Sequence, residues 1–327
     1  MNIQDIVNTI LETSDSGRVI RVLDKAAPIA LSFIGLGNQA TTWPPKIEAL
    51  GVMVTNKCGA KCEHCFNNSS PDGTNVLGVG DIEILVKHLL NNDNPLKVVG
   101  LSGGEPFLYE QLPLLVKTLK KYGVLVTITS GGTAITESKL KAVAQQGLDG
   151  LVISFDHFHT PFVNRRRLIN LFETAVSLNI RTKVSYGIGP GVESDLRKLN
   201  SELPSEVELE IHPIDKIGRG VDLQDYQLDE SHSIGKECSN CSSEFSSMAL
   251  NCDGAIYPCC SIGGFTEGLK LSHIDEIKNG ASIVDSYKNK GHLENLHGTG
   301  VNFLVGSVEP YRKCDVCYRA MNSEKLQ

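Results

Sequence analysis

Short apolar segments alternate with helical segments over residues 47–211, and this alternation restricts the fold more than any other feature of the chain. Six segments are apolar enough to form buried strands: residues 50–55, 97–101, 124–129, 151–155, 182–186 and 207–211. Helical spacing marks the sequence between them, at residues 82–89, 112–119, 139–146, 165–179 and 194–203. Asp81 is expected to cap the first of these helices. Strict alternation with near-continuous apolar strands predicts an α/β fold whose parallel sheet is buried on both faces.

The sixth strand segment differs from the other five. Three glutamates alternate with three apolar residues over residues 206–211. Because successive side chains of a strand point to opposite faces, one face of this strand must meet water or polar groups. We therefore expect this strand to lie at the edge of an unclosed barrel.

Three cysteines, Cys58, Cys62 and Cys65, follow the first strand segment in a C-x3-C-x2-C pattern. Thiolates at such short spacings hold iron–sulfur clusters, and three of them leave one iron of a four-iron cluster open to another ligand. A zinc site is the alternative, with His64 as the fourth ligand, although its neighbour Cys65 restricts its reach. A disulfide fits less well, because dense cysteines in a chain without secretory features favour metal or redox chemistry.

Composition and charge disfavour several classes of protein. A formal charge of −7 offers no electrostatic footprint for nucleic acid. Asp5, Glu12 and Asp15 stand where a signal peptide would carry positive charge. The longest apolar stretch, residues 26–37, is interrupted by Pro28 and is too short to span a bilayer. We expect a cytoplasmic protein without a nucleic-acid or membrane partner, in which the thiols stay reduced.

The three cysteines, followed by Gly103-Gly104-Glu105-Pro106, resemble the motifs of the radical SAM enzymes. The resemblance implies a partial (β/α)6 barrel and a [4Fe–4S] cluster whose open iron chelates S-adenosylmethionine. The cluster's electron then cleaves this molecule to a 5′-deoxyadenosyl radical. By the same resemblance, residues 103–106 meet the methionine amino group, and His64 stands where the family usually carries an aromatic side chain close to the adenine.

Further candidate residues follow the later strand segments. Ser130 occupies the middle of a Thr-Ser-Gly that resembles the Thr-Asn-Gly of relatives. Ser154 and Asp156 match a Ser-x-Asp that in relatives lies beside S-adenosylmethionine or the substrate. His157 and His159 could bind a second metal, but we favour a contact with the substrate. Residues 186–193 match a glycine-rich family segment only in part, and residues 218–220 resemble the Gly-Arg-Ala turn after the last barrel strand.

A second group of cysteines lies beyond residue 236: Cys238, Cys241, Cys252, Cys259, Cys260, Cys314 and Cys317. On spacing alone, two C-x2-C pairs could form a structural zinc site. The stretch 241–259 resembles the opening of the auxiliary-cluster domains called SPASM and twitch. This resemblance implies one auxiliary [4Fe–4S] cluster, and its ligands are expected to be Cys241, Cys259, Cys314 and Cys317. Cys238 could replace Cys241.

The chain of 327 residues is too long for one small core. We divide it into an N-terminal helical extension (1–46), a radical SAM barrel (47–215) and a C-terminal auxiliary-cluster domain (216–327). An amphipathic helix is expected over residues 3–11 of the extension.

The reaction expected of such an enzyme begins with hydrogen abstraction from a substrate carbon. Our first hypothesis is modification of a ribosomally made peptide by epimerisation, with Cys260 as hydrogen donor and Cys252 as the second candidate. An electron donor such as flavodoxin or ferredoxin would be its partner. The alternatives are oxidative cross-linking of a peptide, or dehydrogenation or epimerisation of a small carbohydrate-like substrate. A different class, an iron–sulfur electron carrier or zinc-stabilised binding protein, is disfavoured by residues 103–106.

Overall fold

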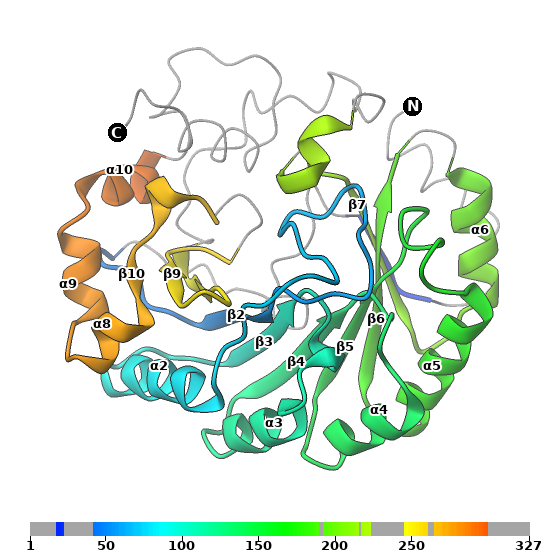
Figure 1. The fold of residues 1–327 in the computed structure, drawn as a ribbon, viewed down its shortest axis with the longest axis horizontal. Helices are drawn as coiled ribbons and strands as arrows, with labels where there is room; N and C mark the ends of the chain where they lie inside the picture. The colour runs from blue at the N-terminus through cyan, green and yellow to red at the C-terminus, as the bar shows by residue number, and fades with distance from the viewer. Residues whose placement is uncertain are drawn as a thin grey trace.

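The computed structural model describes residues 18–22, 42–189, 192–215, 217–223, 245–260 and 265–299. Within them, six parallel strands occur in sequential order: β2 (Ala49–Thr55), β3 (Val98–Gly103), β4 (Leu125–Ser130), β5 (Gly150–Ser154), β6 (Arg181–Ile188) and β7 (Glu208–Pro213). The helices between them are α2 (Val79–Asn91), α3 (Leu112–Lys120), α4 (Glu137–Ala144), α5 (Arg165–Ser177) and α6 (Glu193–Glu202). These helices lie along the outer side of the strands (Figure 1). The predicted partial (β/α)6 barrel is confirmed.

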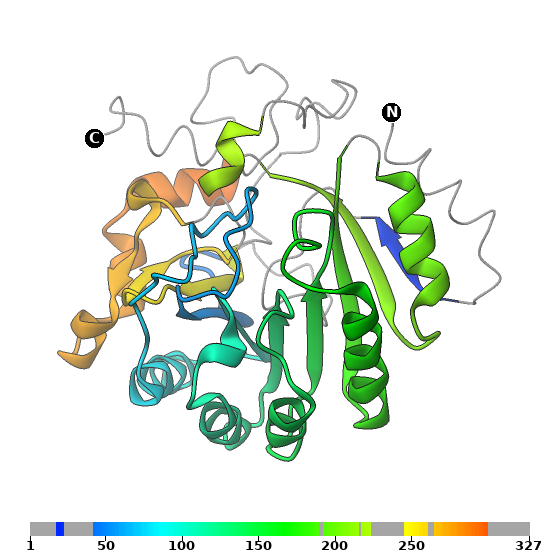
Figure 2. The ribbon, with the colours of Figure 1, turned by 45° about the vertical axis from the view of Figure 1, so that its right-hand side comes forward.

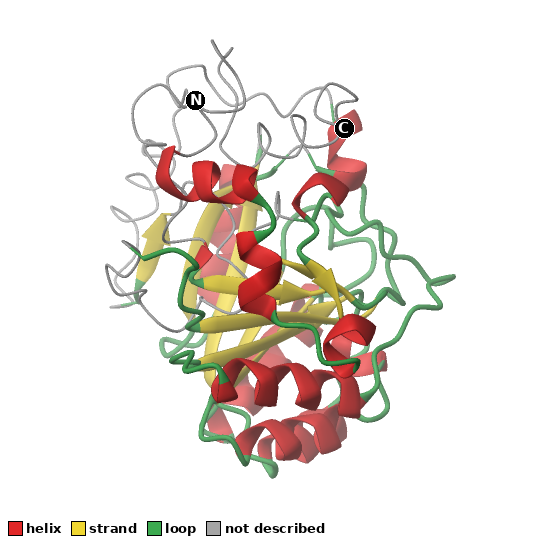
Figure 3. Cartoon of the chain, turned by 90° about the vertical axis from the view of Figure 1, so that its left-hand side faces the viewer, coloured by secondary structure: helices red, strands yellow, loops and turns green. Residues whose placement is uncertain are grey.

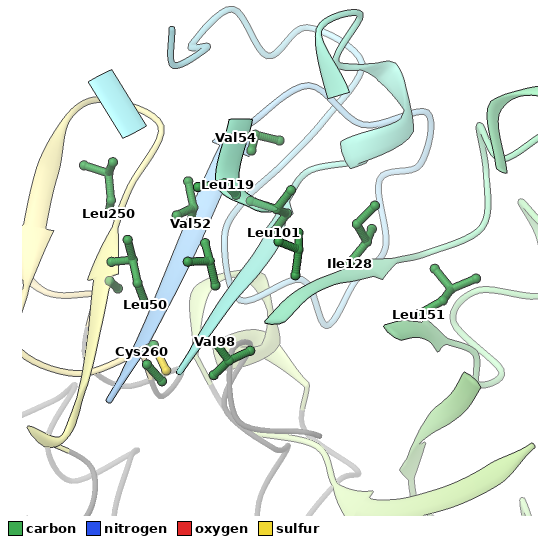
Figure 4. Close-up of a cluster of buried hydrophobic side chains, with 14 of the residues drawn as sticks. Leu50, Val52, Val54, Val98, Leu101, Leu119, Ile128, Leu151, Leu250 and Cys260 are labelled. Carbon is green, nitrogen blue, oxygen red and sulfur yellow. The ribbon is translucent and has the colours of Figure 1, made fainter. Parts of the chain in front are cut away.

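Alternation along each strand divides its side chains between a packed face and the interior of the barrel. Leu50, Val52 and Val54 of β2 are fully buried in the main hydrophobic core, which includes apolar residues of α2 and α3. Figure 4 shows these side chains together with Leu101, Leu119 and Ile128. Polar residues at strand ends, such as Ser102, Thr129 and Ser154, line a cavity on the inner side instead.

The sheet continues beyond the six barrel strands at both sides. β1 (Ile20–Val22) pairs in parallel with β7, and Figure 2 shows it in blue on that side. β8 (Ser247–Leu250) pairs in parallel with β2, and β9 (Ala255–Tyr257) and β10 (Ser272–His273) extend the sheet in antiparallel fashion. Among the described residues this makes one ten-stranded sheet. The predicted edge position of β7 is therefore wrong, because β1 occupies its outer side.

The polar face of β7 is buried and charge-compensated. Glu210 is only 3% exposed, and its carboxylate lies 2.5 Å from Nζ of Lys183 on β6. Glu208 lies 3.3 Å from the same Nζ and also pairs with Arg181. The alternating glutamates thus meet partners on the neighbouring strand, which satisfies the expectation of polar groups on this face.

The last described helices cover the outer side of α2 and the β8–β10 strands. They are α8 (Ile274–Lys278), α9 (Ile283–Lys288) and α10 (Gly291–Thr299), and Figure 3 shows the red helices on this side in front of the yellow strands. Asp81 pairs with Lys278 of α8 at 2.7 Å. It does not cap α2, whose N-cap is Gly78 without a side-chain bond, so that prediction is wrong.

No helix of the described ranges is long and apolar enough to cross a membrane. The expected helix at residues 3–11 lies outside the described residues. The two domain boundaries, after residues 46 and 215, stay predictions.

Candidate active site

A cavity of about 180 Å³ opens at the carboxyl ends of the barrel strands, where parallel βα folds gather ligands. Most of the predicted site residues line it: Cys58, Cys62, His64, Cys65, Gly103, Gly104, Ser130, Ser154, Asp156 and Cys260. Glu105, Pro106, Cys252 and Cys259 are buried but lie outside this lining. Cys238, Cys241, Cys314 and Cys317 fall outside the described residues.

The cysteine loop is tied to its surroundings through backbone hydrogen bonds. The amide of Cys58 donates to the Ser70 carbonyl at 2.9 Å, and the amide of Cys65 donates to the Cys62 carbonyl at 3.2 Å. Burial raises the pKa of Cys58 to about 11 and that of Cys62 to about 12, and the charge of Cys65 adds to both shifts. Thiols with these raised pKa values would ionise readily only beside a metal centre, since a cation offsets the cost of burying thiolates.

The placement of these donors fits an iron–sulfur cluster better than zinc. Ligands of one tetrahedral zinc ion lie about 3.8 Å apart, as Zn–S bonds of about 2.3 Å require. The three sulfur atoms do not all come within 4.8 Å of one another, as one shared ion would require. The predicted fourth zinc ligand is also engaged elsewhere, because His64 stacks on Phe158 at 4.6 Å and lies 3.4 Å from Asp156. A cluster, whose irons take one thiolate each, suits the wider spacing.

Gly103 and Gly104 are required by the close approach of β3 to the cysteine loop. Gly103 has φ +136°, and a Cβ there would lie 2.3 Å from the Thr55 carbonyl oxygen. A Cβ on Gly104 would lie 2.2 Å from the Lys57 carbonyl oxygen. The Gly104 amide donates to the Thr55 carbonyl at 2.6 Å, which joins the two segments. The glycines thus hold the loop that carries the cysteines, as well as lining the cavity.

Glu105 supports the cavity wall from behind. Its carboxylate accepts hydrogen bonds from Ser130 Oγ at 2.7 Å, from the Phe107 amide at 3.1 Å, and from the amide and hydroxyl of Thr133 at 3.2 Å each. Burial raises the pKa of Glu105, and these hydrogen bonds oppose the rise. Pro106 begins the short 3-10 helix Pro106–Leu108 that Glu105 caps. Glu105 therefore holds Ser130 and Thr133 in place instead of facing the cavity.

Asp156 organises two histidines at the cavity wall. Its Oδ1 lies 2.8 Å from Nδ1 of His159 and accepts from the Phe158 amide at 3.0 Å, while Oδ2 faces His64 Nε2. Burial by itself raises the pKa of Asp156, but the charges of His159 and His64 and the hydrogen bond from His159 hold it well below its usual range. Burial also lowers the pKa of His64 to about 4. Both lowered pKa values are consistent with an ionised Asp156 carboxylate beside a neutral His64 imidazole near neutral pH.

This trio of His64, Asp156 and His159 also has the composition and spacing of a metal site. Nδ1 of His159 and Oδ1 of Asp156 are already joined to each other by a hydrogen bond. His157, the other predicted histidine, does not belong to the trio, and its ring is tilted against that of Phe158 with the two ring centroids 3.8 Å apart. The trio is therefore a hydrogen-bonded group in which both imidazoles, those of His64 and His159, line the cavity beside Asp156.

Sequence reasoning missed three groups at this site. Ser185 Oγ lies 2.9 Å from His212 Nε2, so β6 and β7 present a hydroxyl–imidazole pair to the cavity. Thr133 joins the Glu105 network. Arg219 lines the cavity and donates through Nε to the Cys62 carbonyl at 2.8 Å. The alternation of β6 and β7 could have located Ser185 and His212, because each directly follows a buried apolar residue of its strand and so points to the opposite face.

The three described C-terminal cysteines have separate surroundings. Cys260 lines the cavity, is 1% exposed, and its amide donates to Ser247 Oγ at 3.4 Å. Cys252 packs against Met53 in a separate buried cluster. Cys259 lies near Tyr287 of α9: burial raises the pKa of Tyr287, and the charge of Cys259 raises it further. Of these thiols, only that of Cys260 shares the cavity with the three-cysteine loop.

Comparisons with known proteins agree with this geometry. A model of the radical SAM superfamily matches residues 52–198. YydG of Bacillus subtilis (strain 168), described as a putative peptide biosynthesis protein, is 26% identical over an alignment of 242 positions that covers 68% of this chain and 72% of that protein. The fold resembles BtrN in complex with AdoMet and 2-DOIA, with a TM-score of 0.50 and 16% identity over 83% of this chain and 92% of that one.

A second solved structure, histidine-tagged anSMEcpe with bound AdoMet, has a TM-score of 0.54 and 14% identity over 83% of this chain and 88% of that one. At such identities these two structures support the fold alone. The cysteine loop, the partial barrel and the family match together show that this chain belongs to the radical SAM superfamily and is a radical SAM enzyme.

Proposed function

We propose that this enzyme modifies a peptide, by epimerisation at an α-carbon in which Cys260 returns a hydrogen atom to the substrate. The observation that carries the proposal is the shared cavity, which Cys260 lines together with Cys58, Cys62 and Cys65. A peptide substrate is supported by the likeness to YydG, described as a putative peptide biosynthesis protein.

The family implies a [4Fe–4S] cluster and S-adenosylmethionine, and Cys58, Cys62 and Cys65 would hold the cluster. When bound, it supplies the electron that converts S-adenosylmethionine into methionine and a 5′-deoxyadenosyl radical. Ser130, Ser154 and the Asp156–His159 pair line the same cavity and would orient the bound molecules. His64, which lines the cavity and stacks on Phe158, would offer a flat surface to the adenine.

Cys260 would complete the reaction. After a hydrogen atom leaves the substrate carbon for the 5′-deoxyadenosyl radical, the thiol donates its hydrogen atom to the opposite face of that carbon. The C–H bond forms as the S–H bond breaks, and a thiyl radical remains on sulfur. One electron from a low-potential donor such as flavodoxin or ferredoxin, with one proton from solvent, restores the thiol. Cys252 is the weaker candidate, because it packs in a different cluster.

The test is turnover in deuterated water, where the thiol exchanges to S–D before it reacts. Epimerisation predicts one deuterium in a product otherwise unchanged in mass. We expect Cys260→Ala to abolish that product while 5′-deoxyadenosine still forms, and Cys252→Ala to leave it. A product lighter by two hydrogens would instead indicate oxidation, either cross-linking of a peptide or dehydrogenation of a small carbohydrate-like substrate.

We further propose one auxiliary [4Fe–4S] cluster with Cys241, Cys259, Cys314 and Cys317 as ligands. Cys259, the described member of this set, is buried just after β9, on the segment that leads to Cys260. Iron analysis of the anaerobically reconstituted protein tests the proposal. About eight irons per chain would support two four-iron clusters, whereas about four irons per chain would rule out the auxiliary cluster.

A further inference from the structure

The short turn after β7 lies directly against the cysteine loop. Gly218 has φ +59°, and a Cβ there would lie 2.3 Å from the Phe66 carbonyl oxygen and 2.6 Å from that of Cys65. Only glycine allows this approach without displacing one of the two backbones. The turn therefore delivers its next residue, Arg219, to a fixed place beside the cysteines.

Arg219 contacts the loop at two points. Its backbone amide donates to the Cys65 carbonyl at 3.1 Å, and its Nε donates to the Cys62 carbonyl at 2.8 Å. The planar guanidinium is thereby held in one orientation. Both hydrogen bonds are accepted by backbone carbonyl oxygens of the loop, so the thiols of Cys62 and Cys65 are left available to a metal.

The charge of Arg219 has no partner within the described part of the chain. Its Nη2 is buried and has no hydrogen-bond acceptor there. Of the residues that line the cavity, Arg219 is the only arginine or lysine among those described. The guanidinium is close enough for its charge to act on Cys58 and Cys62. Among the described residues, a cation without an ion-pair partner therefore stands beside three cysteines whose ligating form is anionic.

We propose that Arg219 is a positioning residue for the cysteine loop and that its charge raises the reduction potential of the cluster held there. Potentials of iron–sulfur clusters depend on nearby charge, hydrogen bonding and exposure. Reduction adds a negative charge, which a nearby cation stabilises, and a partly buried site screens that interaction weakly. This role concerns the start of the reaction and is independent of the substrate and of Cys260.

The experiment is a redox titration of the anaerobically reconstituted full chain, followed by electron paramagnetic resonance. The signal that changes when S-adenosylmethionine is added identifies the cluster of the three-cysteine loop. Arg219→Gln removes the charge and keeps a donor, whereas Arg219→Lys keeps the charge. Arg166→Gln, at an exposed position on α5, is the matched control.

We expect Arg219→Gln to disfavour reduction about tenfold, which is about 59 mV for one electron. Arg219→Lys should stay near the wild-type potential, and Arg166→Gln should equal it. Loss of iron to a chelator should also be several-fold faster in Arg219→Gln. If Arg219→Gln holds no cluster while Arg219→Lys does, this result supports the need for a positive charge at residue 219 as strongly as a shift in potential would. A wild-type potential and iron retention in Arg219→Gln would overturn the proposal, and so would equal loss of the cluster from both variants.

Discussion

At the scale of single residues, the contact between the buried Asp156 and the partly buried His64 joins the cysteine loop to the end of β5. His64 lies between two cysteines in the sequence, yet its imidazole turns toward Asp156 and Phe158. Adjacency in the sequence suggested that His64 could complete a zinc site. In the folded chain the His64 imidazole instead contacts the buried Asp156 carboxylate and the Phe158 ring, two groups that are distant in sequence.

The pKa of His64 predicts how stability depends on pH. Burial lowers it from an unfolded value of about 6.5 to about 4. The unfolded chain therefore binds more protons between these values, so the free energy of unfolding should fall as the pH drops from about 6.5 toward 4. His64→Phe, which keeps a flat ring, should remove this part of the decline. Urea denaturation of both proteins at several pH values measures the effect, and parallel curves would contradict it.

At the scale of elements, the approach of β3 to the cysteine loop makes glycine essential at residue 104. Gly104→Ala should lower the free energy of unfolding by about 1–3 kcal/mol, as overpacking commonly does, and should reduce iron retention because the loop must shift. Gly80→Ala in α2 is the control. A Cβ there meets nothing within 4 Å, so stability should be unchanged or slightly raised. Equal stability and iron content in both variants would contradict the account.

The ion pair between β6 and β7 yields a second test at this scale. Lys183→Met removes the cation that faces Glu210, which leaves a buried carboxylate and should cost about 3–5 kcal/mol. Adding Glu210→Leu should recover most of the loss, because the orphaned charge is then removed as well. Thermal and denaturant unfolding of the single and double variants measure this recovery. A double variant as unstable as Lys183→Met would show that the strands depend on the pair itself.

The barrel strands could be predicted because each is a nearly continuous apolar run bounded by polar residues. β2 and β5, for example, begin within one residue of the predicted segments. β1 could not be predicted, since its three residues, Ile20–Val22, carry no periodicity of their own. It forms only because β7 offers a free edge, which is a property of the folded sheet.

At the scale of the whole molecule, the cysteine loop and Gly103 to Pro106 could be predicted to act together, because both follow neighbouring parallel strands. The contacts of Arg219 and the hydroxyl–imidazole pair of Ser185 and His212 could not. They depend on how residues far apart in sequence meet at one end of the barrel. The cysteine loop could thus be found from the sequence, whereas Arg219, Ser185 and His212 could be placed beside it only from the structure.

The sheet also brings the C-terminal cysteines to the barrel. β8 pairs with β2, the strand that precedes the cysteine loop, and the antiparallel return through β9 leads to Cys260. A residue some 200 positions beyond the loop thereby reaches the same cavity. This connection supports the proposal that Cys260 completes a reaction that begins at the three-cysteine loop.

The most direct test of the account is the formation of 5′-deoxyadenosine from S-adenosylmethionine under a strong reductant, measured by chromatography and mass spectrometry. The wild-type protein, reconstituted with iron and sulfide without oxygen, should form it, because the three thiols that follow β2 would hold a cluster with one open iron. Cys58→Ala should form none above the background without reductant. Equal amounts from Cys58→Ala and the wild-type protein would contradict the assignment of the active site to the three-cysteine loop.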